Sequence, residues 1–168
     1  MNLFGIDDER HLRAAEGWLG LGNPAEAKLE LDNLAPELQK HPDVLELRWE
    51  ISFKESNWDA CRDFARALTE VAPERPGGWI HLAYAARRAA GGSVQAAWDI
   101  LQPAAEKFPE EVIIAFNLAC YACQLGNLSE ARKWLEKAFE IGDDENKLKQ
   151  MVLEEPDLKA LQSEIKES

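Results

Sequence analysis

Apolar residues recur along this chain at intervals of three and four, which is the spacing of one face of an α-helix. Trp79, Leu82, Ala83 and Ala86, for example, fall on a single helical face. Alternation with a period of two, which indicates strands, is nearly absent, and most glycines and prolines lie between the periodic segments. The pattern predicts an all-α fold.

Four residues that favour the start of a helix mark a repeat in this pattern. A side-chain oxygen at such a position accepts a hydrogen bond from an amide of the first helical turn. Successive starts are separated by 34, 36 and 34 residues, and the four residues are Asn23, Asn57, Ser93 and Asn127. The longer interval contains Gly91-Gly92, which we interpret as a two-residue insertion in a turn.

Each helix start is followed four residues later by a small side chain, and apolar residues follow at eight and eleven. These offsets share one helical face, so the small side chains allow a neighbouring helix to approach closely. The small residues are Ala27, Cys61, Ala97 and Ala131. We expect Ala27, Ala97, Ala119 and Ala131 to be buried where helices meet.

A partner helix precedes each start, and its pattern resembles that of a known repeat family. In a 34-residue frame Trp79, Leu82, Ala83 and Ala86 occupy positions 4, 7, 8 and 11, as in the tetratricopeptide pattern W-x2-L-G-x2-Y. The chain therefore resembles the tetratricopeptide repeat (TPR) family over residues 8–142. The resemblance implies a right-handed α-solenoid of four helix-turn-helix units in a single domain of residues 1–168, with residues 143–168 as a C-terminal helical cap.

The connection between the first and second units departs from the regular spacing. Pro42 follows Leu34 by eight residues, whereas the corresponding interval is five in later units. We therefore expect the second helix of the first unit to be a turn longer and the next helix to be a turn shorter. This frame puts Ser52 at position 8 and Trp49 at position 5.

Composition limits the classes of partner. The chain has 19 Lys and Arg against 31 Asp and Glu, a formal net charge of -12. Such a balance repels phosphate groups, so we expect no nucleic-acid or membrane partner. Three cysteines in no disulfide-like framework, with no leader-like or membrane-spanning stretch, favour reduced thiols and a cytoplasmic location.

The most chemical-looking motif is the C-x-x-C of Cys120 and Cys123. Reactive pairs of this spacing normally lie at a helix N-terminus, where the thiol pKa is lowered. These two cysteines fall in the middle of a predicted helix, and no second ligand pair for zinc is present. Packing or groove lining is the favoured interpretation, and redox or metal chemistry is the alternative. No phosphate-binding loop or nucleophile motif occurs, so we expect no cofactor, no metal and no enzyme activity.

The resemblance also implies where a partner binds. In TPR proteins the first helix of each unit lines a concave groove through positions 2, 5, 6, 9, 12 and 13. Those positions include Glu16, Glu46 and Glu50, and the predicted binding residues are Trp49, Phe53, Ile80, His81, Tyr84, Arg87, Arg88, Phe116, Asn117 and Cys120. The alternative is that these residues cover one another or contact the cap. A carboxylate clamp known from one TPR subfamily is not expected, because Leu12 and Glu16 stand at its first-unit positions.

These observations predict a non-enzymatic module that binds a peptide or a partner helix in the groove. The alternative is a self-associating structural protein, forming a homodimer, or a dedicated chaperone for a secreted partner.

Overall fold

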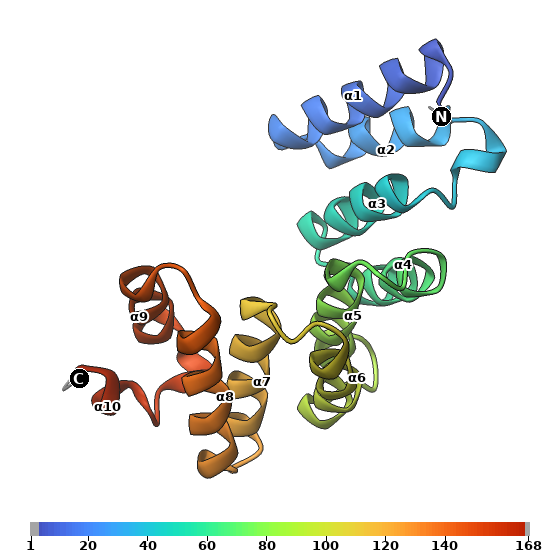
Figure 1. Cartoon of the computed structure of the whole chain (residues 1–168). Coiled ribbons are helices and arrows are strands. Elements are labelled where there is room, and N and C mark those ends of the chain that lie inside the picture. Colours follow the sequence, from blue (N-terminus) through green and yellow to red (C-terminus); the bar gives the residue numbers. More distant parts are fainter. Residues whose placement is uncertain (1–3, 167–168) are drawn as a thin grey trace. The chain divides into compact units, whose positions relative to one another are not determined.

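The computed structural model describes residues 4–166, and this part of the chain contains ten α-helices, two short 3-10 helices and no strand (Figure 1). The prediction of an all-α fold is confirmed. Contacts between residues divide the chain into two units, the first ending at Gly91 and the second beginning at Gly92. The division falls at the predicted glycine insertion.

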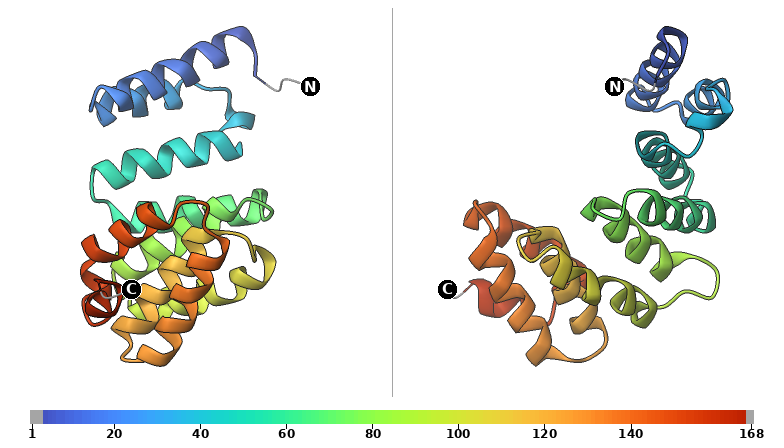
Figure 2. Two further views of the ribbon diagram at one scale, coloured as in Figure 1. Left: turned by 60° about the vertical axis from the view of Figure 1, so that its left-hand side comes forward. Right: turned by 45° about the vertical axis from the view of Figure 1, so that its right-hand side comes forward.

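The first unit consists of two helix pairs and one further helix. Its elements are α1 (Ile6–Gly20), α2 (Pro24–Asp32), the 3-10 helix η1 (Pro36–Leu38), α3 (Pro42–Lys54), α4 (Trp58–Val71) and α5 (Pro76–Arg88). Helix α1 packs on α2, α3 packs on α4, and α5 packs against α4. Figure 2 shows α1, α2, α3 and α4 as successive helices of this unit. An aliphatic core formed by α1, α2, η1 and α3 includes Leu19, Leu31, Leu34, Leu38, Val44 and Ile51.

The second unit begins with three helices in sequence and ends with shorter elements. Its elements are α6 (Val94–Lys107), α7 (Val112–Gln124), α8 (Leu128–Ile141), α9 (Glu145–Glu154), the 3-10 helix η2 (Pro156–Leu158) and α10 (Gln162–Lys166). Helix α7 packs against both α6 and α8, and η2 packs against α7. The helical segment expected after Asp143 is present, and Leu148, Val152, Leu158 and Leu161 anchor it as buried side chains.

All four predicted helix starts are confirmed. The side-chain oxygens of Asn23, Asn57, Ser93 and Asn127 each accept a hydrogen bond from the amide three residues on, at 3.2, 3.2, 3.0 and 3.2 Å. The expected close contacts are confirmed as well, because Ala27, Ala97, Ala119 and Ala131 each have an exposed fraction of 0%.

Three of the four turns that precede these starts share one backbone conformation. The residue before the helix start has a left-handed φ in each, 76° at Gly22, 55° at Ser56 and 80° at Gly126. Glycine adopts this conformation without strain, whereas a serine is strained there. The same tight turn therefore joins the helices of three pairs. In the pair that contains Ser56, the turn strains the backbone.

The expected helix lengths around the first connection are wrong. Helix α2 has nine residues against fourteen in α4, α6 and α8, and α3 has thirteen, as do α5 and α7. Pro36 prevents α2 from continuing, because it has no amide hydrogen and forces the preceding residue into an extended conformation. The additional residues form η1. The side-chain amide of Gln39 donates to the carbonyl of Leu31 in α2 and to that of Leu34 in the following turn.

The expected frame for α3 is displaced by three positions. The amides of Asn23, Asn57 and Asn127 donate to the carbonyls of Trp18, Ser52 and Ala122, respectively, which makes these three residues equivalent. Ser52 therefore stands at position 11, and Trp49 stands at position 8, where Ala15 and Ala119 stand in other units. Because a large ring replaces a small side chain, Trp49 must pack against an adjacent helix.

Candidate functional site

Five rings from three helices of the first unit form a continuous aromatic cluster. Helix α3 supplies Trp49 and Phe53, α4 supplies Trp58, and α5 supplies His81 and Tyr84. Neighbouring ring centroids lie 3.8 to 6.5 Å apart, in stacked, tilted and edge-on arrangements. Apart from the closer stack of Trp49 on His81, these separations are within the range in which aromatic side chains attract one another beyond simple burial. We call this group the aromatic cluster.

The innermost contact of the aromatic cluster joins Trp49 and His81. Their rings are nearly parallel, at an interplanar angle of 6° and a centroid distance of 3.8 Å. Only 7% of Trp49 is exposed, and its Nε1 is buried with no hydrogen-bond partner in the described residues, as is Nδ1 of His81. Burial lowers the pKa of His81 to about 4, so the imidazole is neutral at physiological pH. The stacked rings of Trp49 and His81 are therefore uncharged and largely apolar.

The outer part of the aromatic cluster is partly exposed and carries a cation. Phe53, Trp58 and Tyr84 are half-buried, while Arg88 is exposed. The guanidinium carbon of Arg88 lies 3.6 Å from the centroid of Tyr84 and 5.6 Å from that of Trp58. Its Nη1 also donates to the carbonyl of Tyr84 at 3.1 Å, which fixes the side chain over the rings. The ring faces that remain exposed are apolar, and the guanidinium of Arg88 lies beside them in a cation–π contact.

Two carboxylates, on α1 and α3, occupy the position in their helices that Tyr84 occupies in α5. Glu16 of α1, Glu50 of α3 and Tyr84 of α5 follow one another at intervals of 34 residues and occupy equivalent positions in their helices. The pKa of Glu50 is raised by partial burial, then by the nearby Glu46 and Glu16, while Lys54 opposes the shift. The carboxylates are therefore close enough to repel one another.

The predicted binding residues are placed unevenly. The structure brings Trp49, Phe53, His81, Tyr84 and Arg88 together in the first unit, with Ile80 and Arg87 half-buried on the same helix α5. The sequence prediction did not include Trp58, because it is the first residue of a second helix and no groove position is assigned there. The only sequence feature that could have pointed to Trp58 is that it lies close to Phe53 along the chain.

The predicted residues of the second unit contribute little surface. Phe116 and Cys120 have exposed fractions of 6% and 4%, and Asn117 is half-buried. The C-terminal elements lie against the same helix, since η2 packs on α7 and the side-chain amide of Gln124 donates to the carbonyl of Asp157 at 3.1 Å. Helix α7 is thus partly covered by the chain itself.

The cysteines are arranged for packing. Burial raises the pKa of Cys123, and burial raises the pKa of Cys61 to about 11, so both thiols hold their protons. Cys120 is buried in the middle of α7. Within residues 4–166, no group of three or more His, Cys, Asp and Glu side chains is placed to hold a metal ion. This environment disfavours the nucleophilic thiolate form.

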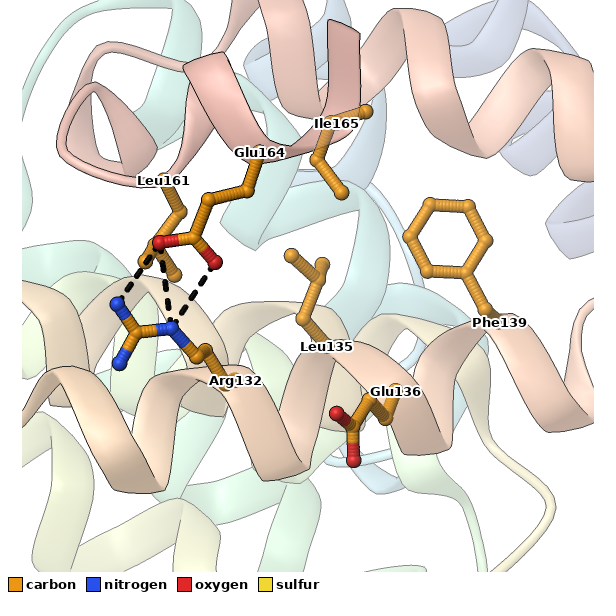
Figure 3. A pocket seen from close by; sticks show the side chains of 7 residues that line it. All are labelled: Arg132, Leu135, Glu136, Phe139, Leu161, Glu164 and Ile165. Atoms are coloured by element: carbon orange, nitrogen blue, oxygen red, sulfur yellow. Dashed lines mark hydrogen bonds and ion pairs between the residues drawn. The ribbon is translucent and has the colours of Figure 1, made fainter. Parts of the chain in front are cut away.

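A small cavity lies between α8 and the C-terminal helix α10 (Figure 3). It measures about 120 Å³, and Leu135, Phe139, Leu161 and Ile165 supply much of its lining. At its edge Arg132 donates to both carboxylate oxygens of Glu164, at 2.8 and 2.9 Å. The space holds about four water molecules, which is too little for a peptide segment. The ion pair instead fastens α10 to α8.

Comparison with solved structures identifies the fold. A thermophilic TPR protein from Thermus thermophilus matches with a TM-score of 0.70 over 94% of this chain and 82% of its own, at 18% identity. A MamA RS-1 double mutant matches with a TM-score of 0.70 over 80% and 75%, at 16% identity. MamA MSR-1 matches with a TM-score of 0.65 over 83% and 80%, at 18% identity. No protein-family model and no curated protein matches the sequence. At such identities the likeness concerns the fold: the chain has the tetratricopeptide-repeat fold, as its helix pattern predicted.

None of the helices within residues 4–166 is both long and apolar enough to cross a lipid bilayer.

Proposed function

We propose that this chain is a non-enzymatic interaction module that binds a peptide or a partner helix at the aromatic cluster. The observation that carries the proposal is the grouping of Phe53, Trp58 and Tyr84, which are half-buried at centroid distances of 5.7 to 6.0 Å. Rings held in this way have little freedom to lose when a partner covers them. Aromatic residues and arginine are the residue types that contribute most to binding in protein interfaces.

The fold supports this placement. In the TPR family the first helix of each unit lines the groove, and α3 and α5 are first helices that supply Phe53 and Tyr84. The second unit has a cavity of about 370 Å³ beside Phe139 and Lys149, but Phe116 and Cys120, the groove residues predicted on α7, are already buried. The first unit therefore offers the better surface, with Arg88 as its polar contact. Ile80 and Arg87 on α5, and separately Asn117 on α7 of the second unit, remain predicted binding residues.

The proposal is tested by comparing partner capture and affinity between variants. The full chain is used to capture partners, and the affinity of a purified partner is then measured by calorimetry. Tyr84→Ala is expected to weaken binding by roughly 1–3 kcal/mol, because a central aromatic contact is lost. Glu136→Lys on α8 is the control, since an exposed charge outside the contact changes affinity little.

Circular dichroism of both variants shows whether the helices are intact. A folded Tyr84→Ala variant that binds as tightly as the original chain, with Glu136→Lys defective, contradicts the proposal and moves the interface to the outer helices.

Self-association is the second candidate, and exposed apolar side chains of the first helix pair favour it. Leu21, Leu29 and Trp18 have exposed fractions of 78%, 57% and 37%. Where such side chains form one contiguous patch, they mark an interface between proteins. Light scattering after size exclusion distinguishes the candidates, because a homodimer through these residues is disrupted by Leu21→Glu and Leu29→Glu but not by Tyr84→Ala.

Location and chemistry complete the proposal. The buried thiols Cys61 and Cys120 suit a reducing compartment, so we place the protein in the cytoplasm. The raised pKa values of Cys61 and Cys123 support a module without thiol chemistry. Turnover of a substrate by the purified chain would contradict this part of the proposal.

A further inference from the structure

Several carboxylates of the first unit form ion pairs, whereas Glu16 and Glu50 are among those that do not. Asp32 pairs with Arg48 at 2.9 Å, and Asp43 and Glu46 pair with Arg75 at 2.8 and 3.3 Å. Glu16 and Glu50 form no such pair within the described part of the chain. Two negative charges on the adjacent helices α1 and α3 are therefore not neutralised by an ion pair.

The surroundings of Glu50 make this lack of a partner unfavourable. Partial burial removes some of the water that stabilises its charge, and Glu46 and Glu16 add repulsion, which together raise its pKa. Lys54 of the same helix offsets part of the repulsion. A cation brought by a partner would relieve the repulsion and would be attracted more strongly than at a fully hydrated site.

The position of Glu50 in α3 also determines what lies next to that cation. Phe53 lies three residues after Glu50, which places the two side chains on the same side of the helix. Arginine suits such a place because its planar guanidinium pairs with a carboxylate and stacks on aromatic rings. Arg88 already makes this kind of contact with Tyr84, at 3.6 Å from the ring centroid.

We propose that the partner segment carries a basic side chain, preferably arginine, that contacts Glu50 and Glu16 while an adjacent apolar side chain covers Phe53 and Tyr84. This proposal rests on the proposed function and adds the chemistry of the partner. An acidic segment is disfavoured, because it would bring a third negative charge to Glu16 and Glu50.

The test uses a synthetic array of twelve-residue peptides. Each peptide combines one leucine or phenylalanine with one arginine, lysine, glutamine or glutamate at every spacing up to four residues. The purified full chain is applied to the array, and the tightest sequences are remeasured in solution by fluorescence polarisation. We expect arginine peptides to bind about tenfold more tightly than their glutamate versions, with a preference that weakens at high salt.

Two variants with the same change in net charge show whether Glu50 is responsible. Glu50→Lys is expected to lower the affinity for the arginine peptide about tenfold and to remove the preference over glutamate. Glu70→Lys is the matched control, because Glu70 is an exposed residue of α4 in the same unit, and it is expected to leave the preference unchanged.

The two levels of the proposal fail in different ways. Peptides that bind without regard to charge, yet lose affinity with Tyr84→Ala, overturn the basic partner and leave the aromatic binding surface standing. If Glu50→Lys and Glu70→Lys reduce the preference for arginine peptides equally, the basic partner is overturned too, because the preference then comes from net charge alone. An array with no bound peptide overturns both the partner chemistry and peptide binding at the aromatic cluster.

Discussion

Acidification should destabilise this fold through His81 in a way that can be isolated. The pKa of His81 is lowered from 6.5 to about 4 by burial against the ring of Trp49. Each pKa unit corresponds to about 1.4 kcal/mol, so charging this imidazole costs about 3 kcal/mol more in the folded chain than in the unfolded one. Between those two pH values the unfolded chain binds more protons, so the free energy of unfolding falls as the pH is lowered. Above about pH 6.5 His81 is neutral in both states, so the full stability of the fold is present there.

A variant that keeps the ring and removes the titration provides the comparison. Urea unfolding is followed by circular dichroism at pH 7.0, 5.5 and 4.5 for the original chain and for His81→Phe. Other groups titrate alike in both proteins, so the difference between the two free energies reports His81 alone. We expect this difference to change by about 2–3 kcal/mol from pH 7.0 to 4.5, with the original chain losing more stability. Parallel pH profiles for the two proteins would refute the reasoning, because His81 would then take up a proton equally well in both states.

Three further predictions concern a turn, the thiols and the C-terminal helix. Ser56→Gly is expected to raise the free energy of unfolding by about 0.5–1 kcal/mol and Gly126→Ala to lower it by about 1 kcal/mol, because both positions have a left-handed φ. Urea denaturation measures both changes. A less stable Ser56→Gly variant and a more stable Gly126→Ala variant would contradict the argument. The double variant Cys120→Ala/Cys123→Ala is expected to stay folded, with its free energy of unfolding lowered by about 1 kcal/mol per site. If elemental analysis of the original chain finds one zinc per chain, the packing role is contradicted. Arg132→Gln is expected to speed amide hydrogen exchange in α10 while the melting temperature hardly changes, and unaltered exchange would show that the apolar contacts alone hold this helix.

Local chemistry explains why the sequence located the helices so well. A residue such as Asn127 caps its helix through an amide only three residues away, at 3.2 Å, so the signal and the structure it predicts lie within one turn. Ala131 is buried because it falls on the packed face of its own helix, and helical periodicity alone indicates that face. The repeat, its four helix starts and the close helix contacts were therefore contained in the sequence.

The aromatic cluster depended instead on how separate helices meet. Only the connection through η1 decides that α3 begins at Pro42 and presents Trp49, rather than a small residue, at position 8. Only the packing of α3, α4 and α5 brings Trp49 onto His81 and Trp58 beside Tyr84. These contacts join residues that are 26 to 32 positions apart, and their geometry follows from turn conformation and from the fit of whole helix faces. Helix propensity and periodicity act over one or two turns, so they carry no information about such contacts, and the tertiary structure alone determines them.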